Sequence, residues 1–157
     1  MTNLNVRRAE PRDVPRLFEL LTEICEFHVN GRPDIFKKGQ KYNEDELNEI
    51  LKDEERPVFV ADDGEKVVGY AFCILKQKKD QAVFNDLLTV YIDDLCVDVE
   101  CRGQGIGRIL FEAVKTYAKE VGAYNIDLNV WEFPGSAVGF YENLGMKTER
   151  RYMEYIL

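Results

Sequence analysis

The sequence is poor in the features that mark secreted, membrane or cysteine-rich metal proteins. Its four cysteines show no CxxC spacing, and we expect them to be free thiols. No apolar run approaches the length that spans a bilayer, and charged residues interrupt the first thirty positions, unlike a signal peptide. These absences predict a protein of the reducing cytoplasm.

Basic residues are also scarce relative to acidic ones. The chain has 21 Lys and Arg against 29 Asp and Glu, a formal charge of -8. This balance argues against a large surface for nucleic acid or anionic lipid, so we expect neither partner. Repeats, linkers and low-complexity segments are lacking too, and 45% of the 157 residues are hydrophobic. We therefore expect one domain over residues 1–157, with a single core.

The spacing of apolar residues predicts alternating strands and helices. Strands are expected over residues 4–9, 57–61, 67–75, 90–98 and 126–131, and helices over 13–28, 43–51, from the glycine cluster to 121, and through 140–144. A polar turn is expected over 76–80, β-like structure from 82 onward, and extended chain over 146–157. This order predicts a mixed α/β domain whose sheet is covered by helices on both faces.

The strongest local signal is the glycine cluster CRGQGIGR, which follows an expected strand and opens an expected helix. Glycines allow a tight turn that aims backbone N–H groups at an anion, and the helix N-terminus adds a positive dipole end. The cluster lacks GK[ST], and Arg108 stands where GxGxxG requires its last glycine. It therefore predicts a phosphate cradle while disfavouring nucleoside triphosphates and NAD.

Two segments, YIDDLCVDVECRGQGIGRILFEAV and AVGFYENLGM, resemble motifs of the GNAT superfamily of acyl-CoA-dependent N-acetyltransferases. The first contains an RxxGxG pattern that begins at Arg102, and the second contains Phe140 and Tyr141 followed by Gly145. The resemblance extends to element order over almost the whole chain. It implies a central, mostly antiparallel sheet with a V-shaped opening between the fourth and fifth strands, near Leu95 and Leu128.

The resemblance also implies a site for acetyl-CoA and a reaction that needs no metal. Backbone groups of the fourth strand would pair with the pantetheine arm, and loop amides would hold the pyrophosphate. The implied strand residues are Leu95, Cys96 and Val97, and the implied loop residues are Arg102, Gly103, Gln104, Gly105, Ile106, Gly107 and Arg108. Tyr141 matches the tyrosine that assists the departing thiolate, a role that suits a neutral phenol.

An amine nucleophile must lose a proton, so a carboxylate is expected near the reacting carbon. Asp93 and Asp94 are the nearest candidates, and Asp93 matches the position of a glutamate in polyamine-acetylating members of the family. In a regular strand Asp93 would share a face with Leu95 and Val97, and Asp94 with Cys96, although a bulge would shift this phase. The alternative is that both acids are solvated surface groups.

Five residues bear further on the site. His28, the single histidine, continues the apolar stripe of the first helix, which favours packing over catalysis. Cys96 and Cys101 have no histidine partner in sequence, which disfavours an acetyl-cysteine route. Pro134 stands where the family commonly has an asparagine, a position expected in the first turn of a helix, and Asn129 is the candidate to replace its contact with the cofactor.

These features predict an N-acetyltransferase in which a primary amine attacks acetyl-CoA directly, with an amide near Leu95 or Cys96 stabilising the oxyanion. The alternative is a non-catalytic acyl-CoA-binding or sensing module. A deep acidic pocket near Asp34 and the two strand aspartates would favour a polyamine-like acceptor, and an open groove a peptide amine. The last apolar segment, which includes Tyr152, could offer an edge for a homodimer.

Overall fold

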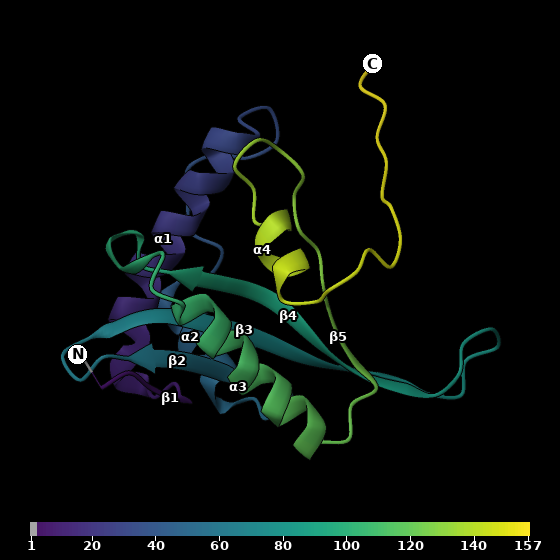
Figure 1. The fold of residues 1–157 in the computed structure, drawn as a ribbon, viewed down its shortest axis with the longest axis horizontal. Coiled ribbons are helices and arrows are strands. Elements are labelled where there is room, and N and C mark those ends of the chain that lie inside the picture. The colour runs from purple at the N-terminus through teal and green to yellow at the C-terminus, as the bar shows by residue number, and fades with distance from the viewer. Residues whose placement is uncertain (1–2) are drawn as a thin grey trace.

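The computed structural model describes residues 3–157 as one sheet with flanking helices (Figure 1). The strands are β1 (Asn5–Arg8), β2 (Val58–Asp62), β3 (Val67–Lys78), β4 (Leu87–Val97) and β5 (Asn125–Leu128). The α-helices are α1 (Val14–Gly31), α2 (Glu44–Lys52), α3 (Ile106–Glu120) and α4 (Val138–Asn143), with 3-10 turns at Pro11–Asp13 and Val99–Cys101. This mixed α/β architecture confirms the predicted fold class.

The strands follow one another across the sheet in chain order, β1 to β5. Neighbours pair antiparallel except β4 and β5, which are parallel and joined by α3. A parallel pair needs a long crossover connection, and the helix after the glycine cluster supplies it. The β3 segment Val67–Cys73 is buried throughout, as its unbroken apolar sequence predicts.

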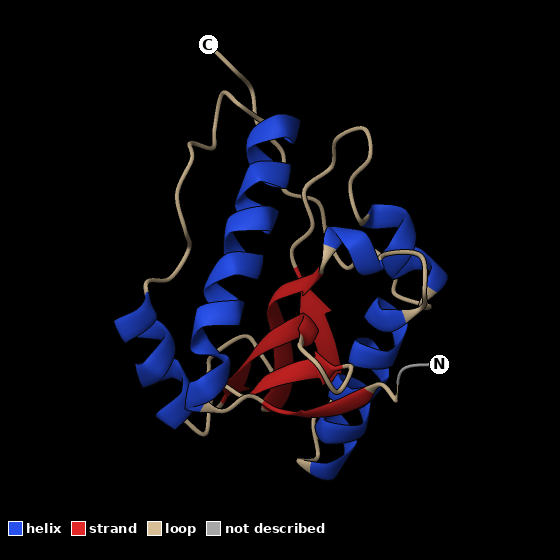
Figure 2. Ribbon diagram, turned by 90° about the vertical axis from the view of Figure 1, so that its left-hand side faces the viewer, coloured by secondary structure: helices blue, strands red, loops and turns tan. Residues whose placement is uncertain are grey.

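Helices cover the two faces of the sheet and bury two apolar clusters (Figure 2). Leu17, Leu20 and Leu21 of α1 pack with α2 on one face. Leu110 and Val114 of α3 pack on the other face. In α1 and α3 the buried residues recur at spacings of three and four, because one stripe of each helix meets the sheet.

Three element boundaries differ from the expectations. Residues 76–78, expected in a polar turn, continue β3, and the connecting loop covers residues 79–86, including positions expected to be β-like. Long β3 and β4 strands support each other there as a two-stranded ribbon that projects from the body (Figure 1). β5 ends at Leu128, whereas the alternation extended to 131, because β4 pairing stops at that point.

Two further observations concern membrane-spanning helices and the cysteines. No helix among residues 3–157 is long and apolar enough to cross a membrane. All four cysteines are free, as their spacing predicts.

Candidate active site

The parallel strands β4 and β5 separate partway along their length. Their registered pairs run from Thr89 with Asn125 to Ile92 with Leu128. β4 continues to Val97, still paired with β3 on its other side. The β4 edge from residue 93 to 97 therefore faces an opening, which is the V-shaped split that the sequence resemblance implied.

A β-bulge at the start of this opening sets the direction of the aspartates. Phe72 pairs with Asp94 while the next residue, Cys73, pairs with Ile92, so Asp93 is the extra residue of β4. A bulge shifts the side-chain alternation by one position. Asp93 and Asp94 consequently both face the α1 and α2 side of the sheet, where Tyr42 and Tyr70 contact them.

The bulge thus changes the face that a regular strand would give Asp93. Regular alternation placed its side chain with Leu95 and Val97, but these two residues pack in the cluster beneath α3. Asp94 does share a face with Cys96, as expected, because both follow the bulge. Two consecutive carboxylates on one face of a strand are an arrangement that a regular strand cannot produce.

Asp94 is half-buried and electrostatically coupled to the predicted catalytic tyrosine. The Tyr70 hydroxyl donates a hydrogen bond of 3.2 Å to its Oδ2 atom. Burial raises the pKa of Asp94 to about 6, because desolvation penalises the charged carboxylate more than Lys41 and Tyr70 favour it. A carboxylate with this pKa can accept a proton near neutral pH.

Tyr141 lies on α4, close enough to β4 for the charge of Asp94 to affect the pKa of its phenol. Burial raises the pKa of the Tyr141 phenol above its usual range, and the charge of Asp94 raises it further. The phenol is therefore neutral at physiological pH and retains its proton for donation. The fold brings Tyr141 and Asp94 together although 47 positions separate them in sequence.

Asp93 is held by two residues of the loop before α2. The Tyr42 hydroxyl donates to its Oδ2 atom at 2.6 Å, and the Lys41 ammonium lies 3.0 Å from Oδ1. Arg56 in turn donates to the Tyr42 hydroxyl at 3.0 Å. The Asp93 side chain is only 12% exposed, so this acid is not a solvated surface group.

The glycine cluster forms the turn between β4 and α3. Gly103 and Gly105 have φ angles of +77° and +80°, a left-handed conformation that favours glycine. Among the described residues, no heavy atom lies within 4 Å of a Cβ built at either position, so the outer side of the turn is open. Ile106, 6% exposed, points into the core. The turn thus offers its main chain, at the N-terminus of a 15-residue helix, to an anion.

Gly107 joins the two sequence motifs. A Cβ on this residue would lie 2.9 Å from the Phe140 ring, which packs edge-on against Tyr141 with centroids 5.0 Å apart. Arg108 donates to the Asn143 carbonyl at 3.4 Å, a second tie between the start of α3 and the end of α4. The glycine at position 107 therefore allows the helix that carries Tyr141 to approach the start of α3.

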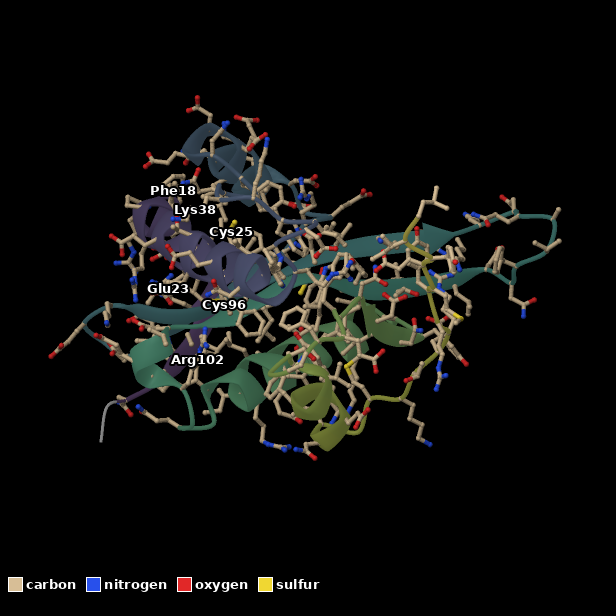
Figure 3. All side chains as sticks on the ribbon, turned by 90° about the horizontal axis from the view of Figure 1, so that it is seen from above. Phe18, Glu23, Cys25, Lys38, Cys96 and Arg102 are labelled. Carbon is tan, nitrogen blue, oxygen red and sulfur yellow. The ribbon has the colours of Figure 1, made fainter. Side chains whose placement is uncertain are left out.

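Cys96 and Arg102 lie next to each other at the end of β4, with Glu23 of α1 nearby (Figure 3). Arg102 donates from Nε to the Val97 carbonyl at 3.1 Å. The Cys96 side chain is 2% exposed and points toward the Leu20 carbonyl, away from the split. Burial raises the pKa of the Cys96 thiol to about 12, so it is a poor nucleophile.

Asn129 lies just beyond the last β4–β5 pair, and its side-chain amide donates to the Tyr91 hydroxyl at 3.2 Å. It is not brought to Tyr141 by any contact of the described residues. Pro134 was expected in the first turn of a helix, but it lies outside α4. It occupies the second position of a turn in which the Ser136 N–H donates to the Phe133 carbonyl and Gly135 has a φ of +83°. Proline followed by such a glycine suits a type II turn.

Three aromatic side chains pack against one another near the end of α1. The rings of His28 and Phe36 stack at 5.1 Å, and Phe36 meets Trp131 edge-on at 5.0 Å. Burial lowers the pKa of His28, with the charge of Lys41 acting in the same direction, which fits the packing role predicted for it. These contacts connect the loop after α1 with the segment after β5.

Several residues of this site carried no sequence signal. Lys41 and Tyr42 contact Asp93, and Tyr70 contacts Asp94. Sequence did not indicate these contacts, because they depend on the bulge in β4 and on the path of the loop before α2. Asp34, one of the three acids whose pocket would favour a polyamine-like acceptor, pairs with Arg32 at 2.8 Å. No cluster of three His, Cys, Asp or Glu side chains that could hold a metal ion occurs among residues 3–157.

Comparison with known proteins gives consistent matches over the chain. Residues 15–146 match the acetyltransferase (GNAT) family. The peptidyl-lysine N-acetyltransferase YjaB of Salmonella typhimurium is 33% identical over 151 residues, which are 94% of this chain and 86% of that protein. A mutant of the BH1408 protein from Bacillus halodurans has a TM-score of 0.93 at 35% identity, covering 98% and 99% of the two chains.

A more distant structure shows the same fold. It is the aminoglycoside acetyltransferase meta-AAC0020 from an uncultured soil metagenomic sample, in complex with sisomicin. Its TM-score is 0.74 at 22% identity, with 98% of this chain and 96% of that chain covered.

Proposed function

The chain belongs to the acetyltransferase (GNAT) family, and from this premise we propose that it transfers the acetyl group of acetyl-CoA directly to a primary amine bound beside it in the β4–β5 split. One observation carries the proposal. Around the split lie an open β4 edge, a glycine turn with open space on its outer side, a half-buried tyrosine with a raised pKa and a pair of carboxylates. These are the parts that amine acetylation requires.

The residues around the split fit acetyl-CoA. On the β4 edge that β5 leaves open, backbone groups of Leu95, Cys96 and Val97 would bind the pantetheine arm as an added strand would. Main-chain N–H groups from Arg102 to Arg108 would hold the pyrophosphate, because the outer side of the glycine turn is open and the α3 dipole favours negative charge. Asn129 contacts Tyr91 instead, so we propose for it only a place at the mouth of the split.

Acetyl-CoA supplies a thioester whose carbonyl carbon accepts the amine nitrogen, with loss of the C–S bond. The Asp93–Asp94 pair takes the proton that the amine must lose, and Asp94 has a pKa suited to this at neutral pH. Tyr141 donates a hydrogen bond or proton to the departing sulfur, because its phenol is neutral. Lys41 and Tyr42 fix the Asp93 carboxylate.

The charges around the split favour a peptide amine over a polyamine. A polyamine needs several unpaired acids, but Arg32 neutralises Asp34 and Lys41 neutralises Asp93, which leaves Asp94 alone of these three without an ion pair. The rings of His28, Phe36 and Trp131 pack together, and the Trp131 side chain is 40% exposed. An exposed aromatic ring suits an alkyl stem that carries one terminal ammonium. The relative named a peptidyl-lysine N-acetyltransferase supports the same acceptor class.

The test is thiol release from acetyl-CoA against lysine peptides, polyamines, amino acids and aminoglycosides, with Tyr141→Phe beside the wild type. The matched control is Tyr124→Phe, since Tyr124 is 72% exposed on the loop before β5. We expect acceptor-dependent release that falls about 10²- to 10⁴-fold in kcat for Tyr141→Phe, the usual contribution of general acid catalysis, and not for the control.

The outcomes separate the claims. Release that is equal in wild type and Tyr141→Phe contradicts the role of Tyr141 but not the acetyltransferase. Release with polyamines alone contradicts the peptide acceptor. Tight binding of acetyl-CoA with no release for any amine would replace the enzyme by an acyl-CoA-sensing module.

A further inference from the structure

The loop between α1 and α2 brings one lysine of the chain onto the acids of the split. The Lys41 Nζ atom lies 3.0 Å from the Oδ1 atom of Asp93 and donates to the Asp93 carbonyl oxygen at 3.2 Å. The Lys41 side chain is 43% exposed, so it stays accessible from solvent. Among the ion pairs of residues 3–157, this is the only one in which a lysine meets Asp93 or Asp94.

The charge of Lys41 also acts on the second acid. Burial raises the pKa of Asp94, and the positive charge of Lys41 opposes that effect. Burial and, after it, the charge of Asp94 raise the pKa of Tyr141. One primary amine of the chain thus lies among the groups proposed above to take a proton from the amine and to give one to the departing sulfur.

The Asp93 carboxylate has an anchor that does not involve Lys41. The Tyr42 hydroxyl donates to the Oδ2 atom of Asp93 at 2.6 Å, and Arg56 donates to that hydroxyl at 3.0 Å. Lys41 contacts the other oxygen, Oδ1. A neutral Lys41 would therefore leave the carboxylate in place and remove its ion pair, so that Asp93 meets the next ammonium unpaired.

We propose that Lys41 is itself an acceptor, and that each molecule acetylates its own Lys41 when it holds acetyl-CoA. This inference rests on the proposed function, because it uses the same site. The ammonium loses a proton to the Asp93–Asp94 pair, and the nitrogen forms a bond to the thioester carbonyl carbon as the C–S bond breaks. The sulfur leaves as a thiol with the proton of Tyr141, and the second proton that the nitrogen loses restores the phenol. The products are Nε-acetyl-Lys41, CoA and one proton released to solvent.

Lys52 offers a comparison within the same chain. Its ammonium also pairs with a carboxylate, that of Glu49 at 2.8 Å, and its side chain is 71% exposed against 43% for Lys41. Uncatalysed acetylation by acetyl-CoA depends on access to the amine, so it should modify Lys52 at least as fast as Lys41. Faster acetylation of Lys41 therefore reports the site and not exposure.

The test is incubation of the purified protein with acetyl-CoA alone, followed over time by peptide mass spectrometry at two protein concentrations. Mapping before acetyl-CoA is added counts any acetyl group gained during expression. We expect Lys41 to be acetylated at least about 10²-fold faster than Lys52, the lower end of what positioned proton transfer contributes. The rate constant should not depend on protein concentration, because the amine and the site belong to one molecule.

Two variants locate the reaction. Tyr141→Phe should slow acetylation of Lys41 by about 10²- to 10⁴-fold and leave that of Lys52 unchanged, since only Lys41 uses the site. Lys52→Arg is the matched control and should leave acetylation of Lys41 unchanged. Circular dichroism shows that both variants retain the fold.

Three results would overturn the inference. One is acetylation of Lys41 no faster than that of Lys52. Another is a rate constant that rises with protein concentration, which means that one copy modifies another. The third is an equal rate in folded Tyr141→Phe. A lysine peptide in parallel samples separates this inference from the proposed function: acetylated peptide without acetyl-Lys41 overturns the inference alone, whereas acetyl-Lys41 without acetylated peptide supports it and contradicts the peptide acceptor.

Discussion

Replacing Asp94 by asparagine should make this protein more stable and less active. The substitution keeps the shape of the side chain and an oxygen that accepts the Tyr70 hydrogen bond, which is 3.2 Å long. It removes only the buried charge. If Asp94 is part of the proton-accepting pair, turnover falls, because an amide cannot take the proton of the amine.

The magnitude follows from the pKa of the carboxyl. Burial raises the pKa of Asp94 from 3.8 to about 6, about two units, and each unit corresponds to about 1.4 kcal/mol. The folded state therefore binds a proton more tightly than the unfolded chain, and wild-type stability falls as the pH rises from about 4 to about 6. Above that window the charge costs about 3 kcal/mol, which Asp94→Asn would regain, a rise in Tm of roughly 6–12 °C.

The assay is thermal and urea unfolding of wild type, Asp94→Asn and Asp93→Asn at pH values on both sides of this window. The advantage of Asp94→Asn should grow from near zero at acidic pH to its full size at alkaline pH. Asp93→Asn is the matched control and should gain nothing, because Lys41 and Tyr42 already stabilise that carboxylate. An Asp94→Asn protein that is no more stable than wild type at alkaline pH would refute the reasoning.

Three other predictions concern packing, the loop before α2 and thiol chemistry. Gly69→Ala should cost about 1–3 kcal/mol of unfolding free energy, since its Cβ would lie 2.9 Å from the Cys96 carbonyl, whereas Gly139→Ala, with open space, should cost none. Both are read from urea unfolding. Tyr42→Phe should cost about 1.5–3 kcal/mol by losing its hydrogen bond to the Asp93 carboxylate, also read from urea unfolding. Iodoacetamide should leave Cys96 unlabelled in the native protein without loss of activity, and mass spectrometry that finds it labelled would contradict its burial.

The fold was predictable from sequence where one local rule decides the outcome. The spacing of Leu17 and Leu21 predicted a helix, and the glycine cluster predicted the turn into α3. The ends of β3 and β5 were not predictable in this way, because pairing partners decide them. Lys76 continues β3 because β4 is long enough to pair with it. β5 stops where β4 diverges, although the alternation continues beyond Leu128.

The site was less predictable than the fold, for a reason that one residue illustrates. Asp93 was chosen from sequence and does lie at the split, but its direction depends on whether β4 is regular, and nothing in YIDDLCV marks the bulge. The extra residue turns two adjacent carboxylates to one face, where the more desolvated of them, Asp94, acquires a pKa near 6. Sequence could thus supply the acids, but it could not show that both face one side of the sheet or that burial raises the pKa of Asp94. The pH profile of kcat/KM for Asp94→Asn tests the role of this carboxylate, because loss of a titration near pH 6 assigns that titration to Asp94.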